Sequence, residues 1–291
     1  MSAATLDPRT VGASRRSAAS VLARLPAPGV VLAAAWLVLV VLAAVAPGLL
    51  SGTDPYAADT GALLQPPSAR HWFGPDQIGR DLYSRVVHGS SLSLRATLVA
   101  VAVGVCLGAA VGLVAGAAGG WVDAVLMRLV DVLLAIPSLL LSLAIITVLG
   151  FGTLNVAVAV GFGSVAACAR VMRAEVLRVH GSPYVEAAAS LGVRRPTVLL
   201  RHVLPNAAGP VLVLAALDFG TAVLAVSSLS FLGYGAKPPT PEWGSLVASG
   251  RDFLGSGWWL TTLPGLVVVA TVLAANRLAR ALDGRREGDL R

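Results

Sequence analysis

Charged residues are scarce in this chain. Only 13% of its 291 residues are Asp, Glu, Lys or Arg, whereas 56% are hydrophobic. Soluble domains average about 25% charged and about 45–50% apolar residues. So little charge cannot cover the surface of a water-exposed globule, and so much apolar sequence excludes a disordered chain. The composition therefore favours a protein embedded in a membrane.

Lysine, cysteine and catalytic motifs are equally scarce. The one lysine, Lys237, follows Ala236 and so cannot belong to a Walker A loop, in which glycine precedes the lysine. Cys106 and Cys168 lie in separate apolar runs, which gives no basis for a disulfide framework or a metal-binding pair. None of the four histidines lies in H-E-x-x-H, and no G-x-S-x-G sequence occurs. We therefore expect no catalysis by this chain alone, and no metal or cofactor bound to it.

Long apolar runs dominate what is present. A helix needs about 20 apolar residues to cross the hydrocarbon core of a bilayer. The sequence predicts an all-α integral membrane protein with six transmembrane helices, at residues 29–50, 96–118, 125–149, 155–171, 205–229 and 258–275. The fourth is short and interrupted by glycine. The first exceeds the about 7–15 residues of a signal-peptide core, so we expect an uncleaved anchor.

The distribution of arginine predicts the orientation. With the N-terminus in the cytoplasm, sixteen of the 22 basic residues lie in inner segments and six in outer ones. Such a bias follows the positive-inside rule and places both termini in the cytoplasm of a cell membrane. No block of five like charges occurs, so the net charge of +7 does not indicate a nucleic-acid partner. We expect cytoplasmic tails at 1–28, predicted to be disordered, and 281–291. The outer segment 51–95 should contain a short helix over 77–88, capped by Asp76.

Two features of the spans concern helix packing. Five glycines recur at four-residue spacing from Gly104 to Gly120, which predicts that the second span packs closely against protein. Each four-residue step turns the helix by about 400°, so the line of glycines drifts around the helix. We therefore expect the second span to cross its neighbour rather than to form a parallel seam with it. Pro137 should bend the third span, either as a hinge in the transport path or as a static kink.

Two acidic residues lie within predicted spans. Asp131 has Arg128 three residues before it, which favours an ion pair at a helix end. Asp218 lies near the middle of the fifth span without a helix-spaced partner. A charge there is costly and usually faces a pathway or another subunit, so Asp218 is a candidate pathway residue.

The longest inner connection, residues 173–204, is expected to carry a short helix. Ser182 is a suitable N-cap, Pro183 fits the first helical position, and Gly192 fits the position after the C-cap. A second short helix should run from Pro196 to about Leu204. So short a helix is marginal in water and must dock on something, either a partner protein or the lipid surface.

These residues resemble a known family. Glu186-Ala187-Ala188, Gly192 and Leu204-Pro205 have the spacing of the EAA loop of binding-protein-dependent ABC importer permeases, although His202 occupies a usually apolar position. Residues 71–85 and 229–244 are similar to segments of the C-type permease subunits of the dipeptide, oligopeptide and nickel importers. Pro75 replaces a threonine of that pattern, and Val226 stands where an acidic residue is common.

The resemblance implies a type I ABC importer permease (MetI-like) bundle with a cytoplasmic coupling helix. The chain would form half of a pore with a homologous second permease, and would work with two ATPase subunits or domains and an extracytoplasmic substrate-binding protein. ATP and magnesium would be bound by the ATPase. The residues implied in ATPase coupling are Tyr184, Glu186, Ala187, Ala188, Gly192, Arg194 and Arg195. Pro239, Pro241 and Trp243 would dock the binding protein or form a gate.

The substrate implied by the resemblance is a di- or oligopeptide, with nickel or haem as alternatives. A hypothesis from a different functional class is a proton-coupled secondary transporter or channel that uses Asp131 and Asp218. A third is a membrane scaffold that transports nothing. The EAA loop favours the importer, because a secondary transporter has no need of a docked cytoplasmic helix.

Overall fold

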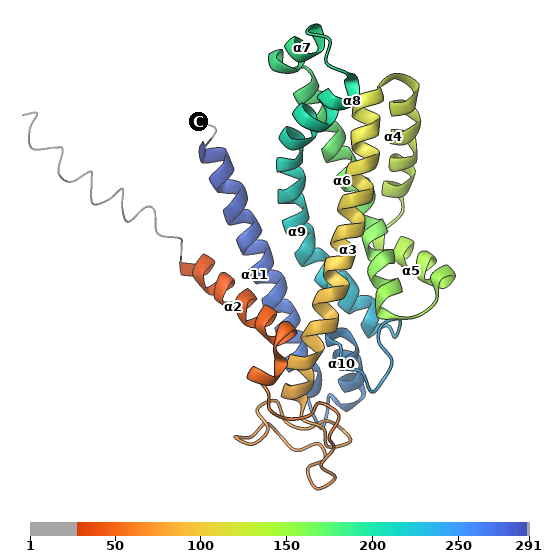
Figure 1. Ribbon diagram of the computed structural model, residues 1–291. Helices are drawn as coiled ribbons and strands as arrows, with labels where there is room; N and C mark the ends of the chain where they lie inside the picture. Colours follow the sequence, from red (N-terminus) through yellow and green to blue (C-terminus); the bar gives the residue numbers. More distant parts are fainter. Residues whose placement is uncertain (1–27, 290–291) are drawn as a thin grey trace, which may run out of the picture.

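The computed structural model describes residues 28–289, which are helical apart from loops and two isolated bridges (Figure 1). The longer helices are α2 (Pro28–Val45), α3 (Leu82–Ala118), α4 (Gly120–Ala135), α5 (Ser138–Leu149), α6 (Thr153–His180), α9 (Leu204–Phe231) and α11 (Trp259–Asp289). The short helices are η2 (Pro47–Leu49), α7 (Pro183–Ser190), α8 (Arg195–Val198), the π-helical turn η3 (Leu199–Val203), α10 (Trp243–Gly250) and η4 (Arg251–Phe253). The predicted tail at 1–28 lies outside the described residues except for Pro28.

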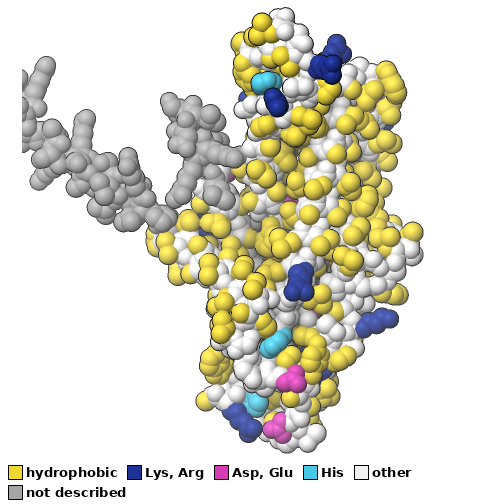
Figure 2. Space-filling view, in the orientation of Figure 1, with side chains coloured by type: hydrophobic (Ala, Val, Ile, Leu, Met, Phe, Trp, Pro, Cys, Tyr) yellow, Lys and Arg dark blue, Asp and Glu magenta, His cyan; other side chains and the backbone are white. Residues whose placement is uncertain are grey.

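The helix count agrees with a six-span protein. Five helical stretches are long and apolar enough to cross a membrane, and α4 with α5 makes a sixth if this bent pair is one span. Figure 2 shows hydrophobic side chains over most of the visible face and few charged ones. The prediction of an all-α membrane bundle is confirmed.

Helices α3 and α6 pack along a glycine seam. A Cβ on Gly108 would lie 2.6 Å from the Cβ of Cys168, and one on Gly116 would lie 2.8 Å from the Val176 side chain. Gly104 meets Ser164 and Gly112 meets Met172 in the same way. Gly120 lies beyond the end of α3, and a Cβ there would meet nothing within 4 Å. The predicted close packing of the second span holds over four glycines, and the seam runs along both helices.

Pro137 divides the third predicted span. Helix α4 ends at Ala135, α5 begins at Ser138, and their axes differ by 98°. Pro137 has no N–H to continue the helix, and it forms the N-cap position of α5. The expected bend is therefore a complete break.

Three predicted boundaries were wrong. Helix α6 is neither short nor broken, because the absent side chain of Gly161 leaves room for the α3 backbone at Ala100. It continues to His180, so the connection to α9 begins at Gly181 rather than at residue 173. The helix expected to end near Leu204 runs through η3 directly into α9, and α11 continues through most of the predicted tail at 281–291.

The separate outer helix over residues 77–88 does not exist. Helix α3 begins at Leu82 and continues through the second span, and its N-cap is Asp81, whose side chain accepts a hydrogen bond from Ser84 N at 3.2 Å. The segment before it is a loop layer at one end of the bundle, opposite to α7 (Figure 1).

Candidate functional site

Helix α7 holds the Glu-Ala-Ala sequence at the far tip of the bundle. It begins where the N–H groups of Val185 and Glu186 donate to Ser182 O at 3.0 and 3.2 Å. The Ser182 hydroxyl donates to Val179 O at 2.5 Å, and the helix starts at Pro183, so Ser182 occupies the predicted N-cap position. The helix ends as predicted at Gly192, whose φ is +78°, a left-handed conformation that glycine adopts without strain.

The two faces of α7 differ. Val185 is 2% exposed and packs into an apolar cluster with Val179, Val198 and Val203. On the other side, Tyr184 is 48% exposed and Leu191 is 85% exposed. Ala187 between them is also exposed, and the spacing of three and four residues puts all three on one face. The bundle therefore anchors one side of α7 and presents an apolar stripe on the other.

A groove of about 540 Å³ lies beside α7. Val185, Val193 and Leu199 form apolar parts of its wall, and Glu186 and Arg195 contribute charges. Glu186, Arg194 and Arg195 are exposed, whereas Ala188 is half-buried against the cluster below α7. The predicted coupling residues thus form one small surface that combines apolar and charged groups.

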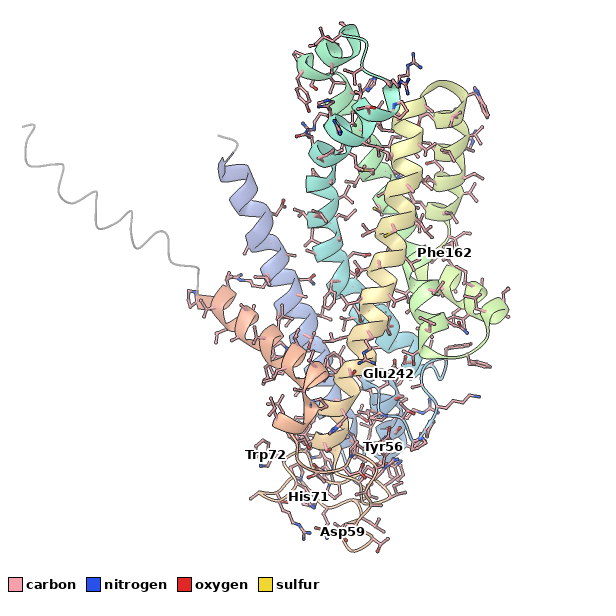
Figure 3. The ribbon with its side chains drawn as sticks, in the orientation of Figure 1. Tyr56, Asp59, His71, Trp72, Phe162 and Glu242 are labelled. Atoms are coloured by element: carbon pink, nitrogen blue, oxygen red, sulfur yellow. The ribbon has the colours of Figure 1, made fainter. Side chains whose placement is uncertain are left out.

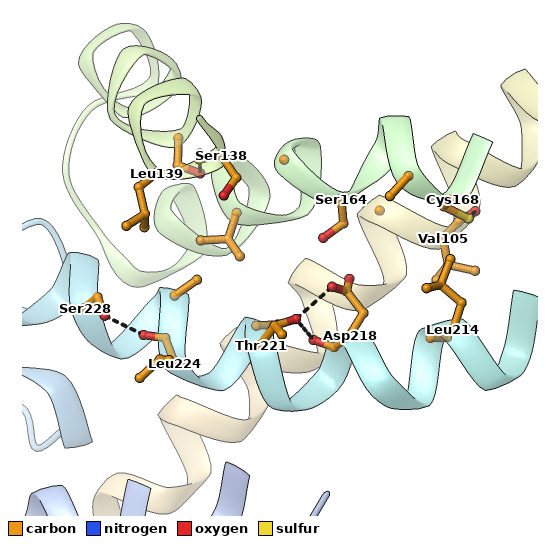
Figure 4. A pocket seen from close by; sticks show the side chains of 18 residues that line it. Val105, Ser138, Leu139, Ser164, Cys168, Leu214, Asp218, Thr221, Leu224 and Ser228 are labelled. Atoms are coloured by element: carbon orange, nitrogen blue, oxygen red, sulfur yellow. Dashed lines mark hydrogen bonds between the residues drawn. The ribbon is translucent and has the colours of Figure 1, made fainter. Parts of the chain in front are cut away.

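A second hollow, of about 400 Å³, lies between α3, α5, α6 and α9 (Figure 4). It opens to the surface of the subunit, because Leu139 and Leu224 in its wall are about half exposed. Its wall consists mainly of small residues, and Asp218 is the only acidic or basic one among them. Asp218 Oδ1 accepts a hydrogen bond from Thr221 Oγ1 at 2.9 Å. Ser138, directly after Pro137, lines the same hollow. The structure thus places one of the two candidate pathway residues in the cavity and the other next to it.

The second acidic residue has a partner that the sequence did not predict. Asp131 Oδ1 lies 2.6 Å from Arg170 Nη2 on α6, so the predicted pairing with Arg128 was wrong. Asp123 makes a similar bidentate pair with Arg173, at 2.5 and 2.6 Å. Both pairs tie α4 to α6. Asp131 is therefore satisfied by a partner within the chain, unlike Asp218.

Asp76, Arg80 and Arg85 form a buried polar network in the loop layer. Figure 3 shows this layer at the end of the bundle that carries His71 and Asp59. Asp76 accepts hydrogen bonds from the N–H groups of Ile78 and Arg80 and from Arg80 Nε at 2.7 Å. Arg85 donates to Pro55 O at 3.0 Å and to Pro239 O at 3.2 Å. The network ties three outer segments to the start of α3, which gives these residues a structural role.

The three predicted docking residues have different environments. Trp243 is fully buried, with its indole N–H on Val86 O at 3.0 Å and its backbone N–H on Ser93 Oγ at 3.1 Å. Pro241 is buried as well, whereas Pro239 is exposed. Trp243 holds α10 on α3 and offers no side-chain surface to a binding protein. Of the three, Pro239 alone remains accessible for docking.

Sequence reasoning missed Glu242. Its side chain is fully buried although no basic residue pairs with it among the described residues. Ser230 Oγ donates to Oε1 at 2.6 Å, and Ala236 N and Thr153 Oγ1 donate to Oε2 at 2.8 and 3.4 Å. The carboxylate thus joins α6, α9 and the loop between α9 and α10. Its only signal in the sequence is a single acid next to tryptophan in a proline-rich segment.

Comparison with known proteins agrees with this architecture. Residues 108–288 match the family described as binding-protein-dependent transport system inner membrane component. The chain is 39% identical over 260 residues to a probable D,D-dipeptide transport system permease protein of Escherichia coli K12, covering 89% of this chain and 86% of that protein. It is 43% identical over 229 residues to an E. coli glutathione transport system permease protein, covering 79% and 75%. It is 35% identical over 247 residues to a dipeptide transport system permease protein of Alkalihalophilus pseudofirmus, covering 85% and 80%.

Two solved structures share the fold. An amino acid ABC transporter superposes with a TM-score of 0.54 and 18% identity, over 70% of this chain and 94% of the other. The methionine ABC transporter MetNI in an inward-facing conformation gives 0.52 and 18%, over 68% and 96%. The matches to both the family and its relatives cover most of the chain. This chain is therefore a membrane-embedded permease of the binding-protein-dependent ABC importer family.

Proposed function

We propose that this chain is half of the translocation pore of an ATP-driven importer of di- or oligopeptides. A homologous second permease completes the pore, and separate ATPase subunits bind ATP and magnesium. An extracytoplasmic binding protein delivers the peptide. The α7 end of the bundle faces the cytoplasm, where the termini also lie.

The form of α7 carries this proposal. It is anchored through Val185 but leaves Tyr184, Ala187 and Leu191 exposed at the tip of the bundle. The helix preceding it, α6, packs against α3 along the whole glycine seam, so a displacement of α7 can reach the bundle through α6 as a rigid element. For coupling, the ATPase must contact α7 differently in its nucleotide-bound and nucleotide-free states.

Peptide is the substrate class that the relatives favour, since they are named for D,D-dipeptide, glutathione and dipeptide transport. None of these three relatives is named for nickel or haem transport. A proton-coupled transporter is disfavoured because Asp131 is held in an ion pair with Arg170.

The direct test is uptake by the complete complex in proteoliposomes. We expect labelled dialanine, D-alanyl-D-alanine or glutathione to accumulate when ATP and the loaded binding protein are present. Uptake should persist when an ionophore collapses the proton gradient and should stop without ATP. Uptake that follows the proton gradient and ignores ATP would contradict the proposal, and no ATP-dependent flux of any peptide would favour a scaffold or another cargo.

A further inference from the structure

The open cavity between α3, α5, α6 and α9 has the features of a ligand site. At about 400 Å³ it lies within the range of small-molecule pockets, and it is large enough for a short peptide. Ser138, Ser164 and Thr221 line it together with alanine, glycine, valine and leucine, whereas the Ser142 hydroxyl donates to the main-chain oxygens of Ser138 and Ala159. Such a wall accepts varied side chains and offers hydrogen bonds to a peptide backbone.

Asp218 is the one fixed charge in this cavity. It lies near the middle of α9 and therefore far from both ends of the span. Within the described residues, its carboxylate has no basic group within 4.0 Å and one side-chain donor, Thr221. Figure 4 shows Asp218 from α9 and Ser164 from α6 pointing into the same space.

An unpaired carboxylate at this depth is costly unless a cation or water compensates it. Asp131 shows the contrast, because the same chain neutralises that acid with Arg170 at 2.6 Å. The Asp218 carboxylate instead remains accessible to a ligand in the cavity. The complementary group on a free peptide is its N-terminal ammonium, a compact cation with three donors that forms strong charge-assisted hydrogen bonds to carboxylate.

We propose that Asp218 receives the α-ammonium group of a peptide during its passage through the cavity. This inference rests on the proposed peptide-import function and adds a recognition step within the permease itself. The Thr221 hydroxyl orients the carboxylate, because its proton is shared between Asp218 O at 2.8 Å and Asp218 Oδ1 at 2.9 Å. The small residues around it leave the peptide side chains unselected.

The test compares two peptides in the complete reconstituted importer, dialanine and N-acetyl-dialanine, each at a concentration that saturates the binding protein. The measured quantity is the ratio of their ATP-dependent uptake rates. Because the binding protein is the same in every preparation, a change in this ratio reports on the permease. Asp218→Asn should lower the preference for the free amine about tenfold, the loss expected from one partly solvated charge-assisted bond.

Asp131→Asn is the matched control, since it neutralises an acid outside the cavity and should leave the ratio unchanged. An unaltered ratio in Asp218→Asn would overturn the proposal, as would failure of that variant to assemble with the second permease, which would assign the charge to subunit pairing. If wild type takes up neither peptide, the proposed function fails rather than this inference.

A second measurement needs no change at Asp218. Ser164→Cys places a thiol across the cavity from the carboxylate, and maleimide labelling of the assembled complex reports whether the site is occupied. Wild type, with its two native cysteines, gives the background. Dialanine should protect Cys-substituted position 164 during turnover, and N-acetyl-dialanine should protect it less. Equal protection by the two peptides would overturn the proposal.

Discussion

At the scale of single residues, the polar groups that hold the outer end together were the hardest to predict. Glu242 lies in a segment rich in proline, where an acidic side chain is usually exposed. The structure buries it completely because donors from three separate segments converge on its two oxygens. These donors are up to 89 residues away, so no local pattern could reveal them. Asp218, by contrast, was predictable as a charge within an apolar run.

Glu242→Gln should destabilise the protein. A glutamine that directs its oxygen toward Ala236 N turns its NH2 group toward Ser230 Oγ, so the serine hydroxyl must accept and its own buried proton loses the acceptor that Glu242 provided. One unsatisfied buried donor costs about 1–3 kcal/mol of unfolding free energy. Thermal unfolding in detergent would measure this as a lower midpoint. Ser245→Ala is the control, because that half-buried hydroxyl bonds only to the main-chain oxygen of Glu242; equal midpoints for the two variants would contradict this account.

Gly112→Ala should also destabilise the bundle. A Cβ at Gly112 would fall inside van der Waals distance of Ala169 O on α6, which is backbone and cannot move aside alone. Overpacking of this kind costs about 1–3 kcal/mol. Gly265→Ala in α11 is the control, since a Cβ there meets nothing within 4 Å. Thermal unfolding should separate the two variants, and a Gly112→Ala midpoint equal to wild type would argue against a close seam in the membrane.

At the scale of helices, the existence of the spans was predictable and their extent was not. Hydropathy indicates which part of a helix can lie in lipid. The residues at which the helix begins and ends depend instead on capping and on packing against other helices. Met172, Val176 and Val179 extend α6 past its predicted end because all three are buried. Their spacing of four and three residues was a helical signal within the predicted loop. Gly192 was predicted correctly because its requirement for a left-handed conformation is local.

Helix α7 should respond differently to changes on its two faces. Val185→Ala removes buried contacts and should cost about 1–3 kcal/mol of stability. Leu191→Ala changes a side chain that is 85% exposed and should leave thermal unfolding unchanged. Leu191→Ala should nevertheless weaken retention of the ATPase during co-purification. If it lowers the unfolding midpoint and leaves ATPase retention intact, the outer face of α7 is not a docking surface.

At the scale of the whole molecule, the two ends of the bundle differ in construction. The end opposite α7 is a polar network held together by Asp76, Arg85 and Glu242, whereas the α7 end projects a small helix beyond the bundle. Between them lies a cavity with one unpaired charge. This arrangement suits a subunit that receives force at one end and binds cargo in the middle. The sequence predicted the ends through the family resemblance, but the cavity depends on packing among four helices.

The central claim is that α7 is the contact through which an ATPase moves this permease. A photo-reactive amino acid at position 186, introduced into the complete complex in its native membrane, tests it most directly; the same group at exposed position 237 in the loop after α9 serves as the control. We predict that position 186 forms an adduct with a P-loop ATPase subunit and that the yield of this adduct changes with ATP. Position 237 should form no adduct with the ATPase. Adducts from position 186 with phospholipid alone would contradict the account.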